Sequence, residues 1–282
     1  MASHIAGTAR LLRDGDVAPV REVNIEGHSP LLLTSDHYGR LLPTRLGNLG
    51  LTEDELTRHI AWDIGIAGVA ERLASTLDAH LIAQRYSRLV IDCNRPPEVA
   101  GSIPVVSDAT AIPGNEGISA DERNARQREI FDPYHRSIDA AINRRVQAHR
   151  PTVLVALHSF TPVYDGTKRP WHIGALYRQK NDQENDQGND QGNHRETILP
   201  RLLLQHLRTQ DGLVVGDNKP YAVSDATDYT IPVHGEARGL IHTGIEIRQD
   251  LIADPSGQEQ WAERLARAFV EIESTLRAEG LT

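Results

Sequence analysis

Histidine side chains follow two short apolar segments of the chain and could hold a metal ion. His37 comes soon after the apolar run 30–34, and His158 comes directly after the run 153–157. A catalytic zinc ion usually takes three nitrogen or oxygen ligands from the protein and leaves one position for water, whose pKa falls to about 7. His37 and His158 are therefore candidate zinc ligands.

The third ligand is expected to be a carboxylate. Asp63 stands at the start of a predicted helix over 63–77, where the helix dipole stabilises a negative charge, and Asp36 is the alternative ligand. The sequence has no short metal motif such as His-Glu-x-x-His. Because a single histidine at the end of a strand is more often a structural side chain, the metal hypothesis depends on these residues taken together.

Two further apolar segments, 89–91 and 244–247, carry polar side chains at their ends. These side chains are Asp92, Asn94, Arg95, Glu246 and Arg248. Ligands of open α/β sheets bind outside the carboxyl ends of the strands, so clusters at the ends of four strands would converge on one crevice. Glu246 is a candidate general base there. The alternative is a structural carboxylate paired with Arg248.

The segments that must position these residues alternate between short apolar runs and longer helical patterns. Strands are expected at 30–34, 80–83, 89–91, 153–157, 214–215 and 244–247, and helices from about 53, over 63–77, in one or two pieces over 121–148, over 195–209 and over 257–278. Nearly continuous apolar strands that alternate with helices favour a mostly parallel sheet. The expected fold is a single α/β domain over 1–282, with a mostly parallel or mixed sheet between helices on both faces.

Two segments are expected to lie outside this core. Residues 1–20 are predicted to form an N-terminal extension. Residues 178–194 are rich in Asn, Asp, Gln and Gly, with Asn-Asp-Gln repeated, which is typical of a low-complexity surface loop. The sequence leaves open whether this insertion covers the site as a lid.

Composition excludes several classes of partner. The net charge is −9 and no stripe of basic residues is present, so nucleic-acid binding is not expected. No apolar window approaches the roughly 18 to 20 residues of a membrane span. The single cysteine, Cys93, allows no intrachain disulfide, which suits a cytoplasmic location, and it rules out a multi-cysteine zinc site. Assembly into a homo-oligomer is left open.

Six segments resemble the N-formylglutamate amidohydrolase-like family, and they run in order over about residues 30 to 252. They are Ser35–Pro43 (SDHYGRLLP), His59–Asp63 (HIAWD), Tyr86–Pro96 (YSRLVIDCNRP), Leu157–Pro162 (LHSFTP), Gly216–Tyr221 (GDNKPY) and Ile245–Leu251 (IEIRQDL). The resemblance implies a zinc-exopeptidase-like three-layer fold, with His37, Asp63 and His158 as metal ligands in that order. Family members often carry Glu-His where this chain has Asp36-His37.

The resemblance also implies a reaction. It is the zinc-dependent hydrolysis of N-formyl-L-glutamate to formate and L-glutamate, a step of histidine degradation, with Glu246 as the general base. The partner would be a small acidic N-acyl amino acid. The alternatives are a related zinc peptidase or amidase that acts on another N-acyl amino acid or a short peptide, and a binding module that has kept the fold without the metal.

An acidic substrate requires local positive charge, and arginine binds a carboxylate with two parallel hydrogen bonds. Arg95 with Asn94 resembles the Asn-Arg pair by which zinc carboxypeptidases bind a substrate carboxylate, so Arg95 is expected to serve both binding and catalysis. Further candidates for a second carboxylate or a developing oxyanion are Arg88, Arg169 and Arg248. The alternative for each arginine is a structural ion pair, with Asp92 or Asp250 as the partner.

Uncharged donors complete the expected substrate site. Asn218, Tyr221 and His234 could each form a hydrogen bond with substrate. A tyrosine after a proline turn more often only packs against its neighbours. A single buried cysteine such as Cys93 is usually inert.

Overall fold

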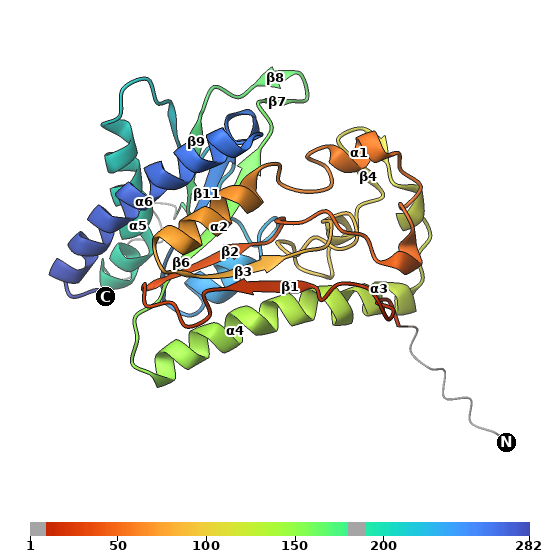
Figure 1. The fold of residues 1–282 in the computed structure, drawn as a ribbon, viewed down its shortest axis with the longest axis horizontal. Helices are drawn as coiled ribbons and strands as arrows, with labels where there is room; N and C mark the ends of the chain where they lie inside the picture. The colour runs from red at the N-terminus through yellow and green to blue at the C-terminus, as the bar shows by residue number, and fades with distance from the viewer. Residues whose placement is uncertain (1–9, 180–189) are drawn as a thin grey trace.

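The computed structural model describes residues 10–179 and 190–282, and its core is a seven-stranded sheet (Figure 1). The strand order is β1-β3-β2-β6-β11-β9-β10. The strands are β1 (Val20–Val23), β2 (Leu31–Ser35), β3 (His80–Gln84), β6 (Val153–Phe160), β9 (Ile173–Leu176), β10 (Val215–Asp217) and β11 (Ile241–Arg248). The pairs β3/β2, β2/β6, β6/β11 and β9/β10 are parallel, whereas β1/β3 and β11/β9 are antiparallel. The sheet is therefore mixed and mostly parallel, as predicted.

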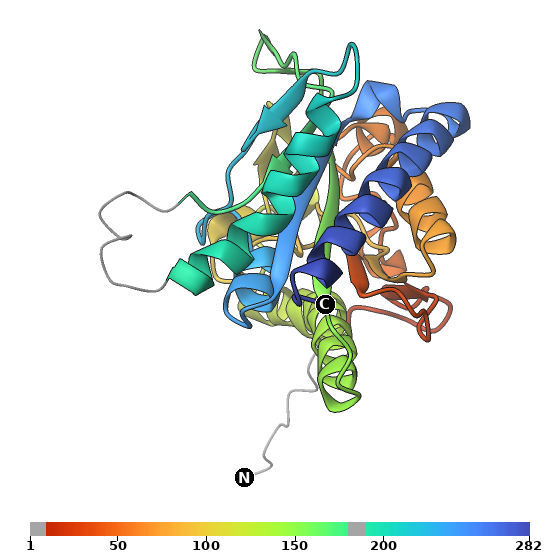
Figure 2. The same ribbon diagram turned by 90° about the vertical axis from the view of Figure 1, so that its left-hand side faces the viewer.

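Helices cover both faces of the sheet (Figures 1 and 2). On one face lie α2 (Ile66–Thr76), α5 (Asp190–Arg208) and α6 (Pro255–Ala278). On the other face lies one continuous helical stretch, made of α3 (Ala120–Arg126), a π-helical turn over Gln127–Phe131 and α4 (Asp132–Gln147). The predicted three-layer α/β arrangement is confirmed.

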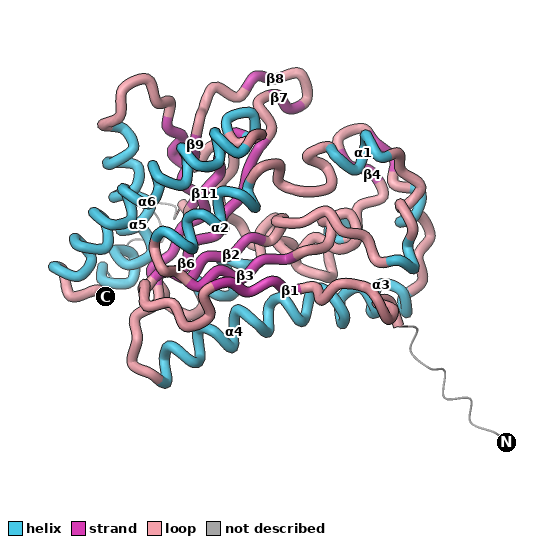
Figure 3. Tube along the Cα trace, viewed as in Figure 1, coloured by secondary structure: helices cyan, strands magenta, loops and turns pink. Residues whose placement is uncertain are grey.

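Short elements connect these layers. They are α1 (Glu53–Thr57), the hairpins β4 (Val106–Ser107)/β5 (Thr110–Ala111) and β7 (Val163–Tyr164)/β8 (Thr167–Lys168), the 3-10 turns Thr44–Leu46, Ala100–Ser102, Pro113–Asn115 and Gln249–Leu251, and a π-helical turn over Ile231–Glu236. Figure 3 shows that loops occupy most of the region beyond the carboxyl ends of β2 and β3. Thr52 caps α1 through a reciprocal hydrogen-bond pair with Glu55.

Alternating side chains of the central strands enter two different apolar clusters. Leu31 and Leu33 belong to the cluster beneath α2 and α6, whereas Leu32 belongs to the cluster beneath α4. In β6, Leu154 lies on the α4 side. Because the side chains of a strand alternate between faces with a period of two, His158 points to the same face as Leu154. The sheet therefore directs His158 away from α2 and α6.

One predicted strand is wrong. Residues 89–91 form turns, not a strand, although all three side chains are buried. Side chains take the place of a neighbouring strand, because Asn115 Nδ2 donates to Leu89 O and Arg126 Nη1 donates to Val90 O. A short apolar run indicates burial but does not identify the partners of its backbone. Asp92, Asn94 and Arg95 therefore follow a buried loop.

Several element boundaries also differ from expectation. Helix α2 begins at Ile66 and not at 63, because Gly65 precedes it with a φ of 80°. Asp63 therefore lies in the loop before the helix. Strands β1 and β9 were not predicted, and both add antiparallel partners to the parallel centre.

The predicted peripheral segments are described only in part. Of the predicted extension, residues 1–9 lie outside the described residues, and Leu11 is buried, with its backbone N–H donating to Glu129. Of the predicted loop insertion 178–194, residues 180–189 lie outside the described residues, and α5 begins at Asp190. The single-domain organisation stays a prediction. Within the described ranges, no helix combines the length and apolarity needed to cross a membrane.

Candidate active site

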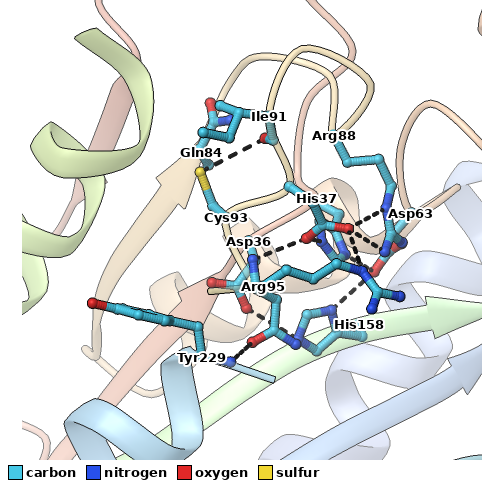
Figure 4. Close-up of polar contacts among 12 residues, drawn as sticks. Asp36, His37, Asp63, Gln84, Arg88, Ile91, Cys93, Arg95, His158 and Tyr229 are labelled. Atoms are coloured by element: carbon cyan, nitrogen blue, oxygen red, sulfur yellow. Dashed lines mark hydrogen bonds and ion pairs between the residues drawn. The ribbon is translucent and has the colours of Figure 1, made fainter. Parts of the chain in front are cut away.

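The predicted metal ligands and the predicted base meet at the carboxyl ends of β2, β6 and β11. Asp36 and His37 directly follow β2, while His158 and Glu246 lie inside β6 and β11, which extend further than predicted. Glu246 and His158 are register partners on these two parallel strands. Figure 4 shows Asp36, His37 and His158 close together with Asp63, which comes from the loop before α2. Residues from distant parts of the chain therefore share one buried cluster.

His37, Asp63 and His158 form a group that could hold a metal ion. One potential ligand atom from each of them lies within 4.8 Å of the others, and all three residues are buried. His158 Nδ1 lies 3.1 Å from Asp63 Oδ2, and His37 Nδ1 lies 3.4 Å from the same oxygen. His37 Nδ1 is buried and makes no hydrogen bond with the described residues. Two imidazoles and a carboxylate are a donor set that suits zinc.

The loop before α2 places the Asp63 carboxylate. The Asp63 backbone N–H donates to His37 O, and the Ser159 backbone N–H donates to Asp63 Oδ2 at 3.2 Å. Two residues later, Gly65 has a left-handed backbone, and a Cβ there would lie 2.0 Å from Ile252 O. Only glycine fits this position without displacing the backbone, so the turn that carries Asp63 depends on Gly65.

A second carboxylate contacts the far nitrogen of each imidazole. His37 Nε2 lies 2.7 Å from Asp92 Oδ1, and His158 Nε2 lies 3.1 Å from Asp36 Oδ2. Each ring therefore has its Nδ1 near Asp63 and its Nε2 beside another acid. In this arrangement Asp63 shares the Nδ1 side of both rings, whereas Asp36 contacts only the opposite side of His158.

The charges of the cluster stabilise one another. Burial opposes ionisation of Asp36, but the hydrogen bond and charge of His158 outweigh it and lower the pKa of Asp36 to about 2. Burial also opposes ionisation of Asp63, and His37 and His158 hold its pKa below the usual value. The pKa of Asp92 is lowered well below its usual value, chiefly by Arg88 and His37, against the effect of burial. All three carboxylates are therefore ionised at neutral pH.

Glu246 has different electrostatics from these aspartates. It is 7% exposed, and its Oε2 has no hydrogen-bond partner within the described residues. Burial raises the pKa of Glu246 to about 7, with a further upward contribution from Asp63, while His158 and His37 act in the opposite direction. A carboxyl group with a pKa near 7 can both accept and release a proton at neutral pH.

Two of the predicted substrate arginines are already paired with carboxylates of the protein. Arg88 donates to Asp92 Oδ2 from Nη2 at 2.6 Å, and its Nη1 lies 3.5 Å from Asp63 Oδ1. Arg248 forms two hydrogen bonds with Asp250, at 2.7 and 3.2 Å. Arg88 thus bridges two acids of the cluster. Arg248 forms the structural ion pair with Asp250 that the sequence analysis gave as its alternative role.

The other two arginines keep donors available. Arg95 has one ion-pair contact among the described residues, from Nε to Asp92 Oδ2 at 3.5 Å. Arg169 takes part in no ion pair between described residues, and its Nη1 is buried without a hydrogen bond. Its guanidinium carbon lies 4.7 Å from the centre of the Tyr164 ring and 4.9 Å from that of Tyr221. Cation–π contacts of this kind fix a guanidinium while leaving its hydrogen-bond donors free.

The uncharged candidates occupy different settings. Asn94 Oδ1 accepts hydrogen bonds from the backbone N–H groups of Tyr229 and Thr230. Asn218 Oδ1 accepts from the backbone N–H of Tyr177. The two amide oxygens therefore hold chain segments in place, and contact of these residues with substrate stays a prediction. Tyr221 is 45% exposed.

His234 and Cys93 are buried. His234 Nε2 lies 2.9 Å from His135 Nδ1, and His135 Nε2 lies 2.8 Å from Cys93 O. Burial raises the pKa of the Cys93 thiol well above its usual value. His234 thus contacts another histidine of the core, and Cys93 is protonated at neutral pH.

Comparison with known sequences decides the family. The sequence model of the N-formylglutamate amidohydrolase family matches residues 29–253, which include every residue of the site described above. The chain belongs to this family. The resemblance that the motifs predict is thus confirmed by the family model over these residues.

Curated N-formylglutamate deformylases align with part of this family member. The protein of Pseudomonas putida is 28% identical over 165 residues, which are 54% of this chain and 61% of that protein. The protein of Pseudomonas aeruginosa is 32% identical over 168 residues, which are 52% of this chain and 60% of that protein. The chain thus spans about three fifths of the length of these curated relatives.

Solved structures match almost the whole N-formylglutamate amidohydrolase domain. A gene product from Agrobacterium tumefaciens is 35% identical and has a TM-score of 0.85, with 95% of this chain and 100% of that chain covered. An N-formylglutamate amidohydrolase from Ralstonia eutropha is 19% identical and has a TM-score of 0.67, with 93% of this chain and 100% of that chain covered. At that identity the second likeness concerns the fold alone.

Two contacts of this site were not anticipated from the sequence. Asp92 was expected in the polar cluster after 89–91 and as a partner of arginine, yet it also contacts His37. The Thr230 hydroxyl donates to Asp36 Oδ1 across a sequence separation of 194 residues. No local pattern marks Thr230, which has a helical backbone and directly precedes the π-helical turn.

Proposed function

We propose that this N-formylglutamate amidohydrolase family member hydrolyses the amide of an N-acyl amino acid, with zinc held by His37, Asp63 and His158. The observation that carries the proposal is a buried group of zinc-type donors in which His37 Nδ1 makes no hydrogen bond with the described residues, with the neighbouring β11 supplying Glu246. The names of the Pseudomonas relatives support N-formyl-L-glutamate as the substrate.

The zinc ligands would be His37 Nδ1, His158 Nδ1 and Asp63 Oδ2, the atoms that already face one another. A zinc ion at this position would polarise the substrate carbonyl and lower the pKa of water. Asp92 and Asp36 would orient the two imidazoles from their Nε2 atoms. The chain itself thus provides both the ligands and the groups that hold them.

Glu246 would act first as a base and then as an acid. It accepts a proton from the attacking water, while the water oxygen forms a bond to the formyl carbon. The bond between the formyl carbon and the nitrogen then breaks, and Glu246 returns the proton to the leaving nitrogen. The products are formate and glutamate, and Glu246 ends in its starting state. The pKa of about 7 that burial gives Glu246 suits both directions of proton transfer.

The two arginines with available donors would bind the two carboxylates of N-formylglutamate. We assign the α-carboxylate to Arg95, which lies next to Asp92, and the side-chain carboxylate to Arg169, which lies between Tyr164 and Tyr221. Arg88 and Arg248 instead hold carboxylates of the protein. Two separated guanidinium groups favour a dicarboxylate over a substrate with one negative charge.

The test is metal analysis of the purified protein together with release of the free amino acid from a panel of substrates. The panel contains N-formylglutamate, N-formylglutamine and N-acetylglutamate at equal concentrations. We expect about one zinc ion per chain and the highest kcat/KM with N-formylglutamate. If the protein contains zinc but hydrolyses only other amides, N-formylglutamate is not its substrate. Protein that neither contains nor binds zinc would overturn the metal proposal.

A further inference from the structure

Asp36 lies between a candidate metal ligand and a hydroxyl group, and none of its surface is exposed. Its Oδ2 lies 3.1 Å from His158 Nε2. Its Oδ1 accepts a hydrogen bond from the Thr230 hydroxyl. The two oxygens of one carboxylate thus contact an imidazole from β6 and a hydroxyl from the start of a π-helical turn.

This contact can fix the orientation of the carboxylate. A carboxylate without a second partner can rotate about its Cβ–Cγ bond and move the oxygen that faces a histidine. The Thr230 hydroxyl retains Oδ1, so Oδ2 stays directed at His158 Nε2. An Nε2–H that donates to Asp36 leaves Nδ1 as the atom available to a metal ion.

Thr230 is itself held in place. It is fully buried, and its backbone N–H donates to Asn94 Oδ1 at 3.1 Å. The neighbouring Tyr229 N–H donates to the same oxygen at 3.0 Å. Asn94 belongs to the loop that also carries Asp92, the acid that contacts His37. One loop therefore supports the orienting carboxylates of both histidines, directly through Asp92 and indirectly through Asn94 and Thr230.

We propose that Thr230 is a positioning residue, which acts through Asp36 to present His158 Nδ1 to the metal ion. The inference rests on the proposed function in one respect, namely that His158 is a zinc ligand. Thr230 touches neither the metal group nor the substrate in this scheme, and its effect passes through a single carboxylate.

The first test compares zinc affinity between matched threonine variants by competition with a chelating dye. Thr230→Val keeps the branched shape and removes the hydroxyl, while Thr230→Ser restores a hydroxyl. Loss of an outer-shell partner typically weakens metal binding about 10- to 100-fold. We expect at least a roughly tenfold loss in Thr230→Val and near wild-type affinity in Thr230→Ser.

Thr243→Val is the matched control. Thr243 is also fully buried, but its hydroxyl donates to the backbone oxygen of Leu176, and its register partner Val155 belongs to the cluster on the other face of the sheet from His158. The same chemical change there should leave zinc affinity within about twofold of wild type, since it removes no contact of Asp36. Equal losses in Thr243→Val and Thr230→Val would overturn the proposal.

The second test reads the 3.1 Å contact between His158 Nε2 and Asp36 Oδ2 directly and does not require metal. A proton on Nε2 that donates to a buried carboxylate gives a downfield NMR signal that exchanges slowly with solvent, and His158→Gln would assign it by its absence. We expect this signal in the wild-type protein with or without zinc. It should broaden in Thr230→Val, remain in Thr230→Ser, and move upfield in Asp36→Asn, where the acceptor is neutral.

The two tests separate failure of the inference from failure of the proposed function. If wild-type protein binds no zinc, the metal proposal is rejected. If its NMR signal still depends on Thr230, the proposed contact from Thr230 through Asp36 to His158 stands. Zinc binding and a signal that are both unchanged in Thr230→Val reject the positioning role alone. If Thr230→Val does not fold, the Asp36→Asn variant gives the same comparison.

Discussion

Glu246 and His158 lie directly opposite each other on the neighbouring parallel strands β11 and β6. Their side chains point to the same face of the sheet, because register partners on adjacent strands share a face. The ladder continues on either side of them, from Ile241 opposite Val153 to Arg248 opposite Phe160. The sheet itself therefore sets the distance between the proposed base and a proposed metal ligand, and the two roles can be separated by mutation.

Glu246→Gln removes the proposed base and keeps its shape. We expect kcat for N-formylglutamate to fall at least about 100-fold, since general base catalysis typically contributes that much. Zinc content should be unchanged because Glu246 is not among the proposed ligands. Formate release and elemental analysis measure the two quantities, and Glu259→Gln on the exposed side of α6 is the control. Full turnover in Glu246→Gln would remove the residue from the mechanism.

His158→Ala deletes a proposed ligand. Zinc retention after dialysis and formate release should both be lost, because two donors remain where three are required. His28→Ala is the control, since the side chain of His28 is 93% exposed and its one ion pair with the described residues is to Asp78. Stoichiometric zinc in dialysed His158→Ala protein would contradict the assignment.

Arg169→Ala should affect acidic substrates selectively. A hydrogen bond to a charged group contributes about 1.5 to 3 kcal/mol, so KM for N-formylglutamate should rise roughly 10- to 150-fold. The KM for N-formylglutamine, which has no side-chain carboxylate, should change much less. Steady-state kinetics with both substrates measure the difference.

Arg40→Ala is the control for this experiment, because Arg40 also lies over an aromatic ring, that of Trp62, and pairs with Glu53. Equal effects of Arg169→Ala on both substrates would assign Arg169 to another part of the substrate.

Gly65→Ala tests the turn that carries Asp63. The new Cβ would lie 2.0 Å from Ile252 O on a backbone with a φ of 80°. Gly212→Ala is the matched control, since its φ of 74° is similar but no atom lies within 4 Å of its Cβ position. The left-handed backbone alone should lower the free energy of unfolding by about 1 to 3 kcal/mol in both variants. We expect a larger decrease in Gly65→Ala, together with weaker zinc binding. Urea unfolding and dye competition measure these changes, and equal losses in both variants would show that the close contact does not matter.

The buried His135 makes folding stability depend on pH. Burial, and then the charge of His234, lower the pKa of His135 to about 3, whereas an unfolded histidine has a pKa of about 6.5. Between these values the unfolded chain binds a proton that the folded chain does not, so this contribution is complete above about pH 6.5 and declines as the pH falls toward 3. From pH 7 to pH 5 it amounts to about 2 kcal/mol.

The measurement is the difference in the free energy of unfolding between wild type and His135→Gln at the two pH values. The raised pKa values of His37, His158 and Glu246 act in the opposite direction, but they are present in both proteins and cancel. A difference that does not change with pH would contradict a neutral His135 in the folded protein.

Strand position in the sequence makes His37 and His158 candidate ligands, and the resemblance to the family supplies the full set with Asp63. His158 comes at the end of a continuous apolar run, so its strand and its side of the sheet follow from local pattern. Glu246 follows in the same way from β11. The choice between Asp36 and Asp63 could not be made, because both acids follow apolar patterns and only the loop before α2 turns Asp63 toward both Nδ1 atoms.

The arginines show where local pattern fails. Arg88, Arg169 and Arg248 are equivalent candidates in the sequence, and Arg95 is distinguished from them only by the resemblance of Asn94-Arg95 to a known pair. Their roles separate only when it is known which carboxylates each guanidinium meets, as for Arg88 between Asp92 and Asp63. The prediction of a strand at 89–91 failed for a related reason. The side chains of Asn115 and Arg126 donate hydrogen bonds to backbone carbonyls of this segment, which would otherwise need a neighbouring strand.

Arg169 and its two tyrosines are attached to the scaffold differently from His158 and Glu246. Tyr164 lies in the short β7/β8 hairpin, with Arg169 directly after it, and Tyr221 lies in the segment after β10, whereas His158 and Glu246 lie inside central strands. Exchange of that hairpin and segment between homologues would leave the paired strands intact. A recombination library confined to 161–170 and 218–223 is therefore a practical route to variants with new acyl amino acid preferences on an unchanged metal group and proposed base.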